Sequence, residues 1–316
     1  MAKRTNRIAA RRQDKRQTWI ARTMTWSGRD AADITQLLHT PRTQSLRVNP
    51  LRGGMTPSNE MAIDWCQNGY TLTNHQDTYA DAVAAGQVYI QNAASWLPVL
   101  ALDPQPGERI LDMCAAPGGK SSHIQAITGN RAELICNDNS RPRLMKLQAN
   151  LQRLGVKAEY ALADATKLSR RDDIGQFDKI LLDAPCSGEG LMTLRREDEK
   201  LFDSWSVAHI RRLSDLQKKL MMEAWKLLKP GGRLVYSTCT MAPEENEAVV
   251  AYLLRRHDDA ELIAMDAPDL PNRVPAVQSW NGRDFAHDMN ACLRLMPGEL
   301  TEAFFVAKLQ KSTSVL

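Results

Sequence analysis

The chain has 316 residues, of which 43% are hydrophobic and 25% are charged, as is typical of a globular protein with one sizeable α/β domain and a smaller companion. No run approaches roughly 18 uncharged apolar residues and no secretory leader is visible, so we expect a cytoplasmic protein without membrane association. The six cysteines lack paired spacing, which argues against a disulfide framework, and neither a CxxC pattern nor a histidine cluster predicts a bound metal.

Positive charge is concentrated in a basic N-terminal arm, residues 1–26. The arm contains eight Lys or Arg and one acid, a net charge of +7, whereas the whole chain carries only +4. Such a segment is typical of a contact with phosphates, and we predict that it binds nucleic acid. The residues alone leave two alternatives open, which are a solvated tail and an organelle transit peptide.

Residues 27–100 form a second region, for which the pattern predicts mixed, mostly helical structure with loops. Within it, the stretch 40–57 is rich in Pro, Gly and Arg and is expected to interrupt regular structure. We expect this region to contribute to RNA binding, as a small companion to the domain that follows.

Residues 101–316 form the third region, in which short apolar runs alternate with amphipathic segments. The runs predict strands over 107–113, 132–138, 158–164, 177–185, 232–238 and 301–309. The amphipathic segments predict helices over 120–129, 140–155 (capped by Ser140, with an apolar stripe at Leu144, Leu147, Leu151 and Leu154), 204–228 and 243–257. The alternation predicts an α/β fold, with a mostly parallel sheet flanked by helices on both faces.

In such a sheet a ligand lies across the carboxyl ends of the strands, where the strand order reverses. The residues that follow the predicted strands are mainly acids and thiols: Asp112 to Lys120, Asp138, Asp164, Asp183 to Cys186, and Cys239. The turn "CAAPGGKS" fails the Walker pattern, and a carboxylate at Asp138 suits ribose hydroxyls but repels a pyrophosphate. Asp164 is in reach of an adenine amino group, so the acidic edge favours the cationic nucleoside S-adenosyl-L-methionine.

The two thiols at strand ends, Cys186 and Cys239, indicate nucleophilic catalysis. A thiolate that adds to carbon-6 of cytosine makes carbon-5 electron-rich enough to accept a methyl group. Asp183 would stabilise the charge change in the ring, and a further acid/base group would remove the carbon-5 proton. Taken singly, each cysteine is as readily explained as a small buried side chain, but their shared position at the ligand edge favours chemistry.

Four segments, "LDMCAAPGGK", "CNDNS", "LLDAPCSGEG" and "YSTCTMAPEENEAVV", resemble the ordered motifs of the Nop/Sun (Fmu) family of RNA cytosine-5 methyltransferases. The resemblance covers roughly residues 45–310. It implies a class I, Rossmann-like methyltransferase fold with S-adenosyl-L-methionine as donor. It also implies that Cys239 is the nucleophile, that Cys186 assists product release, and that Lys120 faces the target base. The cofactor-binding residues that it implies are Cys114, Ala115, Ala116, Pro117, Gly118, Gly119, Lys120, Asp138, Arg143 (near the ribose), Asp164 and Asp183.

The expected partner is RNA, with ribosomal RNA (rRNA) favoured over transfer RNA (tRNA), and the expected state is a monomer. Arg195 and Arg196 are candidate phosphate contacts. Alternatives are a DNA cytosine-5 methyltransferase, in which Cys186 would attack, and a non-catalytic RNA-binding assembly factor that retains the fold. A redox protein is a weaker alternative, because the two thiols are far apart in sequence and form no CxxC motif.

Overall fold

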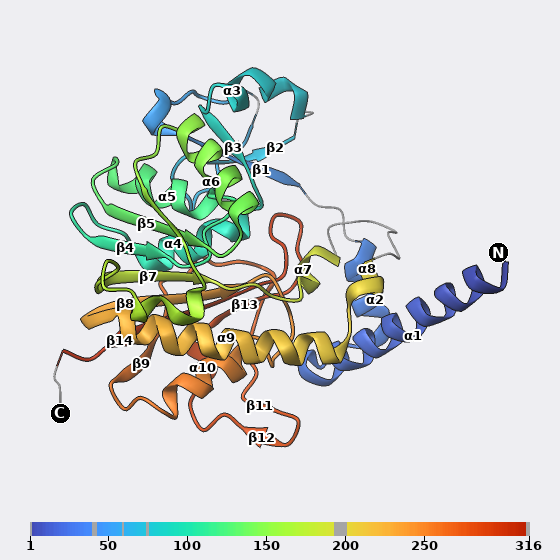
Figure 1. Cartoon of the computed structure of the whole chain (residues 1–316). Coiled ribbons are helices and arrows are strands. Elements are labelled where there is room, and N and C mark those ends of the chain that lie inside the picture. The colour runs from blue at the N-terminus through green and yellow to red at the C-terminus, as the bar shows by residue number, and fades with distance from the viewer. Residues whose placement is uncertain (1, 40–42, 59, 74–75, 193–200, 314–316) are drawn as a thin grey trace.

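The computed structural model describes residues 2–39, 43–58, 60–73, 76–192 and 201–313 (Figure 1). Its main feature is a sheet in the order β10-β13-β14-β8-β7-β4-β5-β6, with β9 paired to β14. Five of these strands are parallel: β4 (Arg109–Asp112), β5 (Glu133–Asp138), β6 (Glu159–Leu162), β7 (Phe177–Asp183) and β8 (Leu228–Thr238). Four more are antiparallel to their neighbours: β9 (Ala260–Ile263), β10 (Arg273–Val274), β13 (Leu293–Leu295) and β14 (Phe304–Lys311).

Strand β4 lies at the point where the strand order reverses. The chain proceeds from β4 to β5 and β6 on one side, and then to β7 and β8 on the other. The predicted strands are confirmed, and the last of them, β14, runs antiparallel to β8. The mostly parallel, Rossmann-like α/β fold is therefore confirmed, and its ligand edge is the carboxyl end of β4, β5, β7 and β8.

Helices cover both faces of the sheet (Figure 1). One face packs against α9 (Val207–Leu227) and α10 (Glu247–Leu254), which bury Trp225 and Val250 among the strand side chains. The other face packs against α4 (Leu97–Leu102), α5 (Gly119–Thr128) and α6 (Arg141–Arg153). This arrangement explains why the central strands are apolar along their whole length.

Two helix starts differ in detail from the prediction. The stripe of leucines on α6 is buried as expected, but the Ser140 side chain makes no capping hydrogen bond. Helix α10 begins at Glu247 instead of Pro243. Residues 243–246 form a turn because Asn246 accepts a hydrogen bond from Thr238 Oγ1 and donates one to the Thr240 carbonyl.

Residues 27–100 contain helices and loops as predicted, and also a three-stranded antiparallel sheet that the prediction of mixed, mostly helical structure did not include. The strands are β1 (Gln44–Val48), β2 (Gly69–Leu72) and β3 (Val88–Ile90), and the helices nearby are α2 (Ala31–His39) and α3 (Ala80–Ala84). Strand β1 was missed because its five residues lie within the Pro-, Gly- and Arg-rich stretch 40–57, which was expected to interrupt regular structure. Its Arg47 is buried and donates a hydrogen bond to Ser122 Oγ of α5 at 2.7 Å.

The basic N-terminal arm is a helix, α1 (Ala2–Ser27), whose second half packs on the rest of the chain. Trp19 is buried against Phe202, with ring centroids 6.2 Å apart. Arg22 pairs with Glu244, with 2.8 Å between the nitrogen and the nearer oxygen. The alternative interpretation of the arm as a solvated tail is therefore wrong for the part that contains Trp19 and Arg22. Within the described part of the chain, no helix combines the length and apolar character that crossing a bilayer requires.

Candidate active site

The two predicted reactive thiols meet at the ends of adjacent parallel strands. Cys186 follows β7 and Cys239 follows β8, and their Sγ atoms lie 3.3 Å apart. The hydrogen bond to Cys239, together with burial, raises the pKa of Cys186 well above that of a free thiol. Cys186 is therefore protonated at neutral pH. We call Lys120, Asp183, Cys186 and Cys239 the thiol cluster.

Asp183 and Lys120 form the polar side of the thiol cluster. Lys120 Nζ lies 2.6 Å from Asp183 Oδ2, and Ser237 Oγ donates to Asp183 Oδ1 at 2.7 Å. Burial is the largest single effect and lowers the pKa of Lys120, but the charge and hydrogen bond of Asp183, together with further charges nearby, outweigh it, so the pKa is raised. Both groups are thus held as an ion pair, which orients the Asp183 carboxylate beside the thiols.

A buried carboxylate behind the thiols was missed by sequence reasoning. Glu245 Oε2 accepts hydrogen bonds from the Ser187 backbone N–H and from Gln217 Nε2, both at 2.9 Å. Burial, with a further contribution from the charge of Glu189, raises the pKa of Glu245 to about 7. The sequence showed Glu245 only as one of several acids at an expected helix start, a position that ordinarily favours carboxylates on the surface.

Glu189 fixes the loop that carries Cys186. Its carboxylate is buried and accepts hydrogen bonds from Trp205 Nε1 at 2.8 Å and from the Met241 N–H at 3.1 Å. Next to it, the Gly190 N–H donates to the Cys239 carbonyl at 2.9 Å. A Cβ at Gly190 would lie 2.6 Å from the Ala303 carbonyl, so only glycine permits this approach. The loops after β7 and β8 are therefore joined by direct contacts.

The turn after β4 has the shape and the charge of a cradle for a cationic ligand. Gly118 has φ +103°, and a Cβ there would lie 2.8 Å from Leu147 Cδ1. Asp112 is buried, and burial raises its pKa to about 7. Its Oδ2 accepts a hydrogen bond from Ser121 Oγ at 2.6 Å, whereas Oδ1 has no partner among the described residues. Burial raises the pKa of Cys114 in the same turn, so this thiol stays protonated.

Asp138 and Arg143 adjoin this turn, whereas the Asp164 side chain is turned toward its own loop. Arg143 lies 3.2 Å from Asp138 Oδ2 and donates to the Ala116 carbonyl at 3.0 Å. Asp164 Oδ1 accepts hydrogen bonds from the N–H and hydroxyl of Thr166 at 3.0 and 2.7 Å, and the side chain is 52% exposed. Arg195 and Arg196 lie outside the described residues.

The structure thus forms two connected groups at one edge of the sheet. Lys120 joins them, because it stands in the turn after β4, at the start of α5, and pairs with Asp183 at the end of β7. The unpartnered oxygen of buried Asp112 fits a positively charged group, which S-adenosylmethionine carries at its sulfonium and its amine. The arrangement can therefore hold a cationic methyl donor on one side and a thiol nucleophile on the other.

Comparison with known proteins identifies the family. The family model described as 16S rRNA methyltransferase RsmB/F matches residues 99–310. The tRNA (cytosine(49)-C(5))-methyltransferase of Pyrococcus abyssi is 36% identical over 295 residues, which is 89% of this chain and 92% of that protein. Ribosomal RNA small subunit methyltransferase F of Aeromonas salmonicida is also 36% identical, over 87% of this chain but only 59% of that protein. The chain thus spans little more than half the length of this second relative.

Solved structures agree with this assignment. A methyltransferase homolog from Pyrococcus horikoshii has a TM-score of 0.74 at 32% identity, and the match covers 92% of this chain and 93% of that one. NSun6 from the same organism, at 24% identity, shares the fold with a TM-score of 0.75, over 90% of this chain and 94% of that one. The chain therefore belongs to the RsmB/F (Nop/Sun) family and is an S-adenosylmethionine-dependent RNA cytosine-5 methyltransferase.

Proposed function

We propose that the enzyme methylates cytosine through a covalent bond between Cys239 Sγ and carbon-6 of the base. The 3.3 Å contact between the thiols, beside the Lys120–Asp183 pair, carries this proposal. The attacking thiolate forms the carbon–sulfur bond and shifts an electron pair toward carbon-5, which then takes the methyl group. S-adenosylmethionine, when bound, supplies that methyl group.

Cys239 attacks and Cys186 acts in release. The raised pKa of Cys186 favours its protonated form, and the place of Cys239 in the segment "YSTCTMAPEENEAVV" supports Cys239 as the attacking thiol. For release, Cys186 first gives up its own proton to solvent, and its thiolate then takes the carbon-5 proton. The electron pair of the carbon–hydrogen bond re-forms the ring double bond, and the carbon–sulfur bond breaks to free Cys239. Cys186, in contact with Cys239, is positioned to assist this proton transfer.

The remaining residues bind the base and the donor. Asp183, oriented by Lys120 and Ser237, faces N3 and the exocyclic amine of the cytosine ring, and Lys120 lies beside it. Asp112, which the sequence placed at the ligand edge but not among the residues implied to bind the donor, supports binding of the cationic donor through its unpartnered oxygen. The residues proposed to hold the donor are Cys114, Ala115, Ala116, Pro117, Gly118, Gly119, Lys120, Asp138, Arg143, Asp164 and Asp183.

An RNA that contains 5-fluorocytosine tests the assignment of the nucleophile. Fluorine at carbon-5 cannot leave as a proton does, so a covalent complex accumulates when the nucleophile is present. The Cys186→Ala variant should keep this complex and Cys239→Ala should lose it, as seen on a denaturing gel. The reverse pattern would make Cys186 the nucleophile, as in the DNA-methyltransferase alternative.

Ribosomal RNA of the small subunit is the first candidate substrate. The description of the matched family and the name of the Aeromonas salmonicida relative support it. Transfer RNA is the second candidate, because the Pyrococcus abyssi relative, whose name gives tRNA cytosine-49, matches this chain over 92% of its own length. Bisulfite sequencing of rRNA and tRNA from cells with and without the gene separates them: the substrate is the RNA that loses a protected cytosine.

RNA binding outside the active site is proposed for residues 1–26 and 27–100. In α1, Arg12 and Lys15 contact residues of α8 (Leu201–Ser204), whereas Arg11 is exposed and available to phosphates. The fit of α1 against Phe202 and Glu244 supports RNA binding over an organelle transit peptide. The monomeric state and the cytoplasmic location stay predictions.

A further inference from the structure

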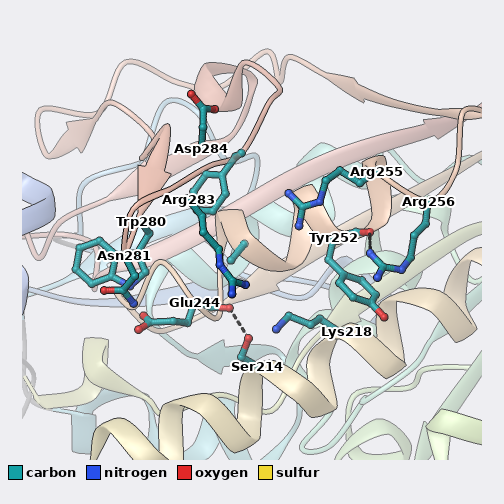
Figure 2. Close-up of a pocket in the computed structure, with 12 residues that line it drawn as sticks. Ser214, Lys218, Glu244, Tyr252, Arg255, Arg256, Trp280, Asn281, Arg283 and Asp284 are labelled. Atoms are coloured by element: carbon teal, nitrogen blue, oxygen red, sulfur yellow. Dashed lines mark hydrogen bonds between the residues drawn. The ribbon is translucent and has the colours of Figure 1, made fainter.

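A cavity lies away from the thiol cluster, and none of the four cluster residues lines it. It has a volume of about 820 Å³ and opens between α9, α10 and a hairpin formed by β11 (Ser279–Trp280) and β12 (Arg283–Asp284) (Figure 2). We call it the α9–α10 groove. Its cationic and aromatic lining residues are Lys218, Tyr252, Arg255, Arg256, Trp280, Arg283 and Phe285.

The α9–α10 groove is positively charged. Four cations line it against two acids, Glu244 and Asp284, and Arg22 of α1 already neutralises Glu244 at 2.8 Å. The guanidinium groups of Arg255 and Arg283 make no hydrogen bond or ion pair with any residue that the structure describes. Figure 2 shows these two side chains directed into the same space, so their charges reinforce each other there.

Aromatic rings accompany the cations. The Arg256 guanidinium lies 3.6 Å from the centroid of the Tyr252 ring, and Lys218 Nζ lies 5.9 Å from the same centroid. Trp280 forms the opposite wall and carries Arg22 of α1 at 5.3 Å from its ring centroid. Phosphate-binding cations interleaved with flat rings are characteristic of surfaces that bind single-stranded nucleic acid.

Two features connect the groove to the rest of the enzyme. Glu244 lines the groove, while its neighbour Glu245 holds the loop that carries Cys186. A further cavity, of about 730 Å³, lies along the same hairpin and shares the lining residues Trp280 and Asn281 with the α9–α10 groove. Its lining also includes Arg29, just after α1. The two cavities therefore follow one another along the hairpin, from the groove to Arg29 near the end of α1.

We propose that the α9–α10 groove binds the phosphate backbone of a single-stranded segment of the RNA substrate, outside the segment that enters the active site. The inference rests on the proposed function, because it takes RNA as the substrate. The continuity with α1 and the ring–guanidinium pairs favour RNA over an acidic protein partner, which would need no aromatic surface for bases.

A uridine 30-mer provides the test, because it has no cytosine and so measures binding without methyl transfer. Its affinity is measured by fluorescence anisotropy over a series of salt concentrations for wild type and Arg255→Gln/Arg283→Gln. The double variant should bind about tenfold more weakly. The slope of its log affinity against log salt concentration should become shallower by about 1.4, or roughly 0.7 for each lost phosphate contact.

The matched control is Lys146→Gln/Lys157→Gln, which removes two exposed cations on α6 and just before β6, away from α9 and α10. It should bind the uridine RNA within twofold of wild type, and thermal melting should show both double variants folded. Equal weakening by both pairs, or an unchanged salt slope in the groove variant, overturns the proposal. So does a groove variant that loses binding of polyglutamate and keeps that of RNA.

The two proposals fail separately. If wild type transfers no methyl group from labelled S-adenosylmethionine to cytosine-containing rRNA or tRNA, the proposed function fails while the uridine-binding result stands. If methyl transfer is robust but the groove variant binds RNA as wild type does, only the groove proposal fails.

Discussion

Two carboxylates at the same edge of the sheet have opposite surroundings. Asp183, at the end of β7, is paired with Lys120 at 2.6 Å and accepts a second hydrogen bond from Ser237. Asp112, at the end of β4, is buried with one oxygen unpartnered among the described residues, and its pKa is raised to about 7. Asp183 on the thiol side thus has its own countercharge, whereas Asp112 on the donor side has no cation paired with it and fits a cationic ligand.

The largest effect should come from the thiol side. Cys239→Ala removes the proposed nucleophile without disturbing the Lys120–Asp183 pair, so methyl transfer should fall by more than about 10⁴-fold. Transfer of labelled methyl groups into RNA measures this loss. Cys292→Ala, which removes a buried thiol outside the cluster, is the control and should retain activity. Substantial activity in Cys239→Ala would contradict the covalent mechanism.

Asp183→Asn should lower kcat by about 10² to 10³-fold, because the amide cannot balance the charge that develops in the ring. Lys120 would lose its partner, so Lys120→Met combined with Asp183→Asn should cost much less than the sum of the two single losses. Single-turnover kinetics of wild type, the two single variants and the double variant gives the coupling free energy between Lys120 and Asp183. Additive losses would show that the ion pair does not act as a unit.

Glu245 extends the comparison, since it resembles Asp112 in burial and in its pKa of about 7. The folded state holds a proton that the unfolded chain loses above about pH 4.3, so the free energy of unfolding should fall as pH rises toward 7. Glu245→Gln removes this dependence. Between pH 5 and pH 8 its free energy of unfolding should rise relative to that of wild type by on the order of 2 kcal/mol. Urea denaturation at several pH values measures it, and parallel profiles would contradict the burial argument.

The smallest effect concerns the donor side. Ionised Asp112 attracts a cation, so the affinity for S-adenosylmethionine should rise as pH increases through about 7. Asp112→Asn should weaken binding by about tenfold at pH 8 and flatten the pH profile. Isothermal titration calorimetry measures both. A variant that keeps the wild-type profile would show that Asp112 does not face the donor.

The local sequence pattern was sufficient to predict the strands of the central sheet. The runs before Asp112, Asp138, Asp183 and Cys239 are apolar and bounded by turns, so their strands and the edge on which those residues lie followed from the sequence. Strand β1 was missed because it is short and lies in the stretch 40–57, whose Pro, Gly and Arg residues predicted a loop. Glu245 was missed because the acids of that segment matched an ordinary helix start.

The sequence by itself determined the fold class, the strand ends and the family, because periodic burial and short motifs are properties of neighbouring residues. Only the tertiary structure decided that Cys186 and Cys239 touch, that Asp112 lacks a partner, that α1 packs on Glu244 and Phe202, and that the α9–α10 groove exists. Each of these depends on segments distant in the chain, whose meeting is fixed by how the whole core packs.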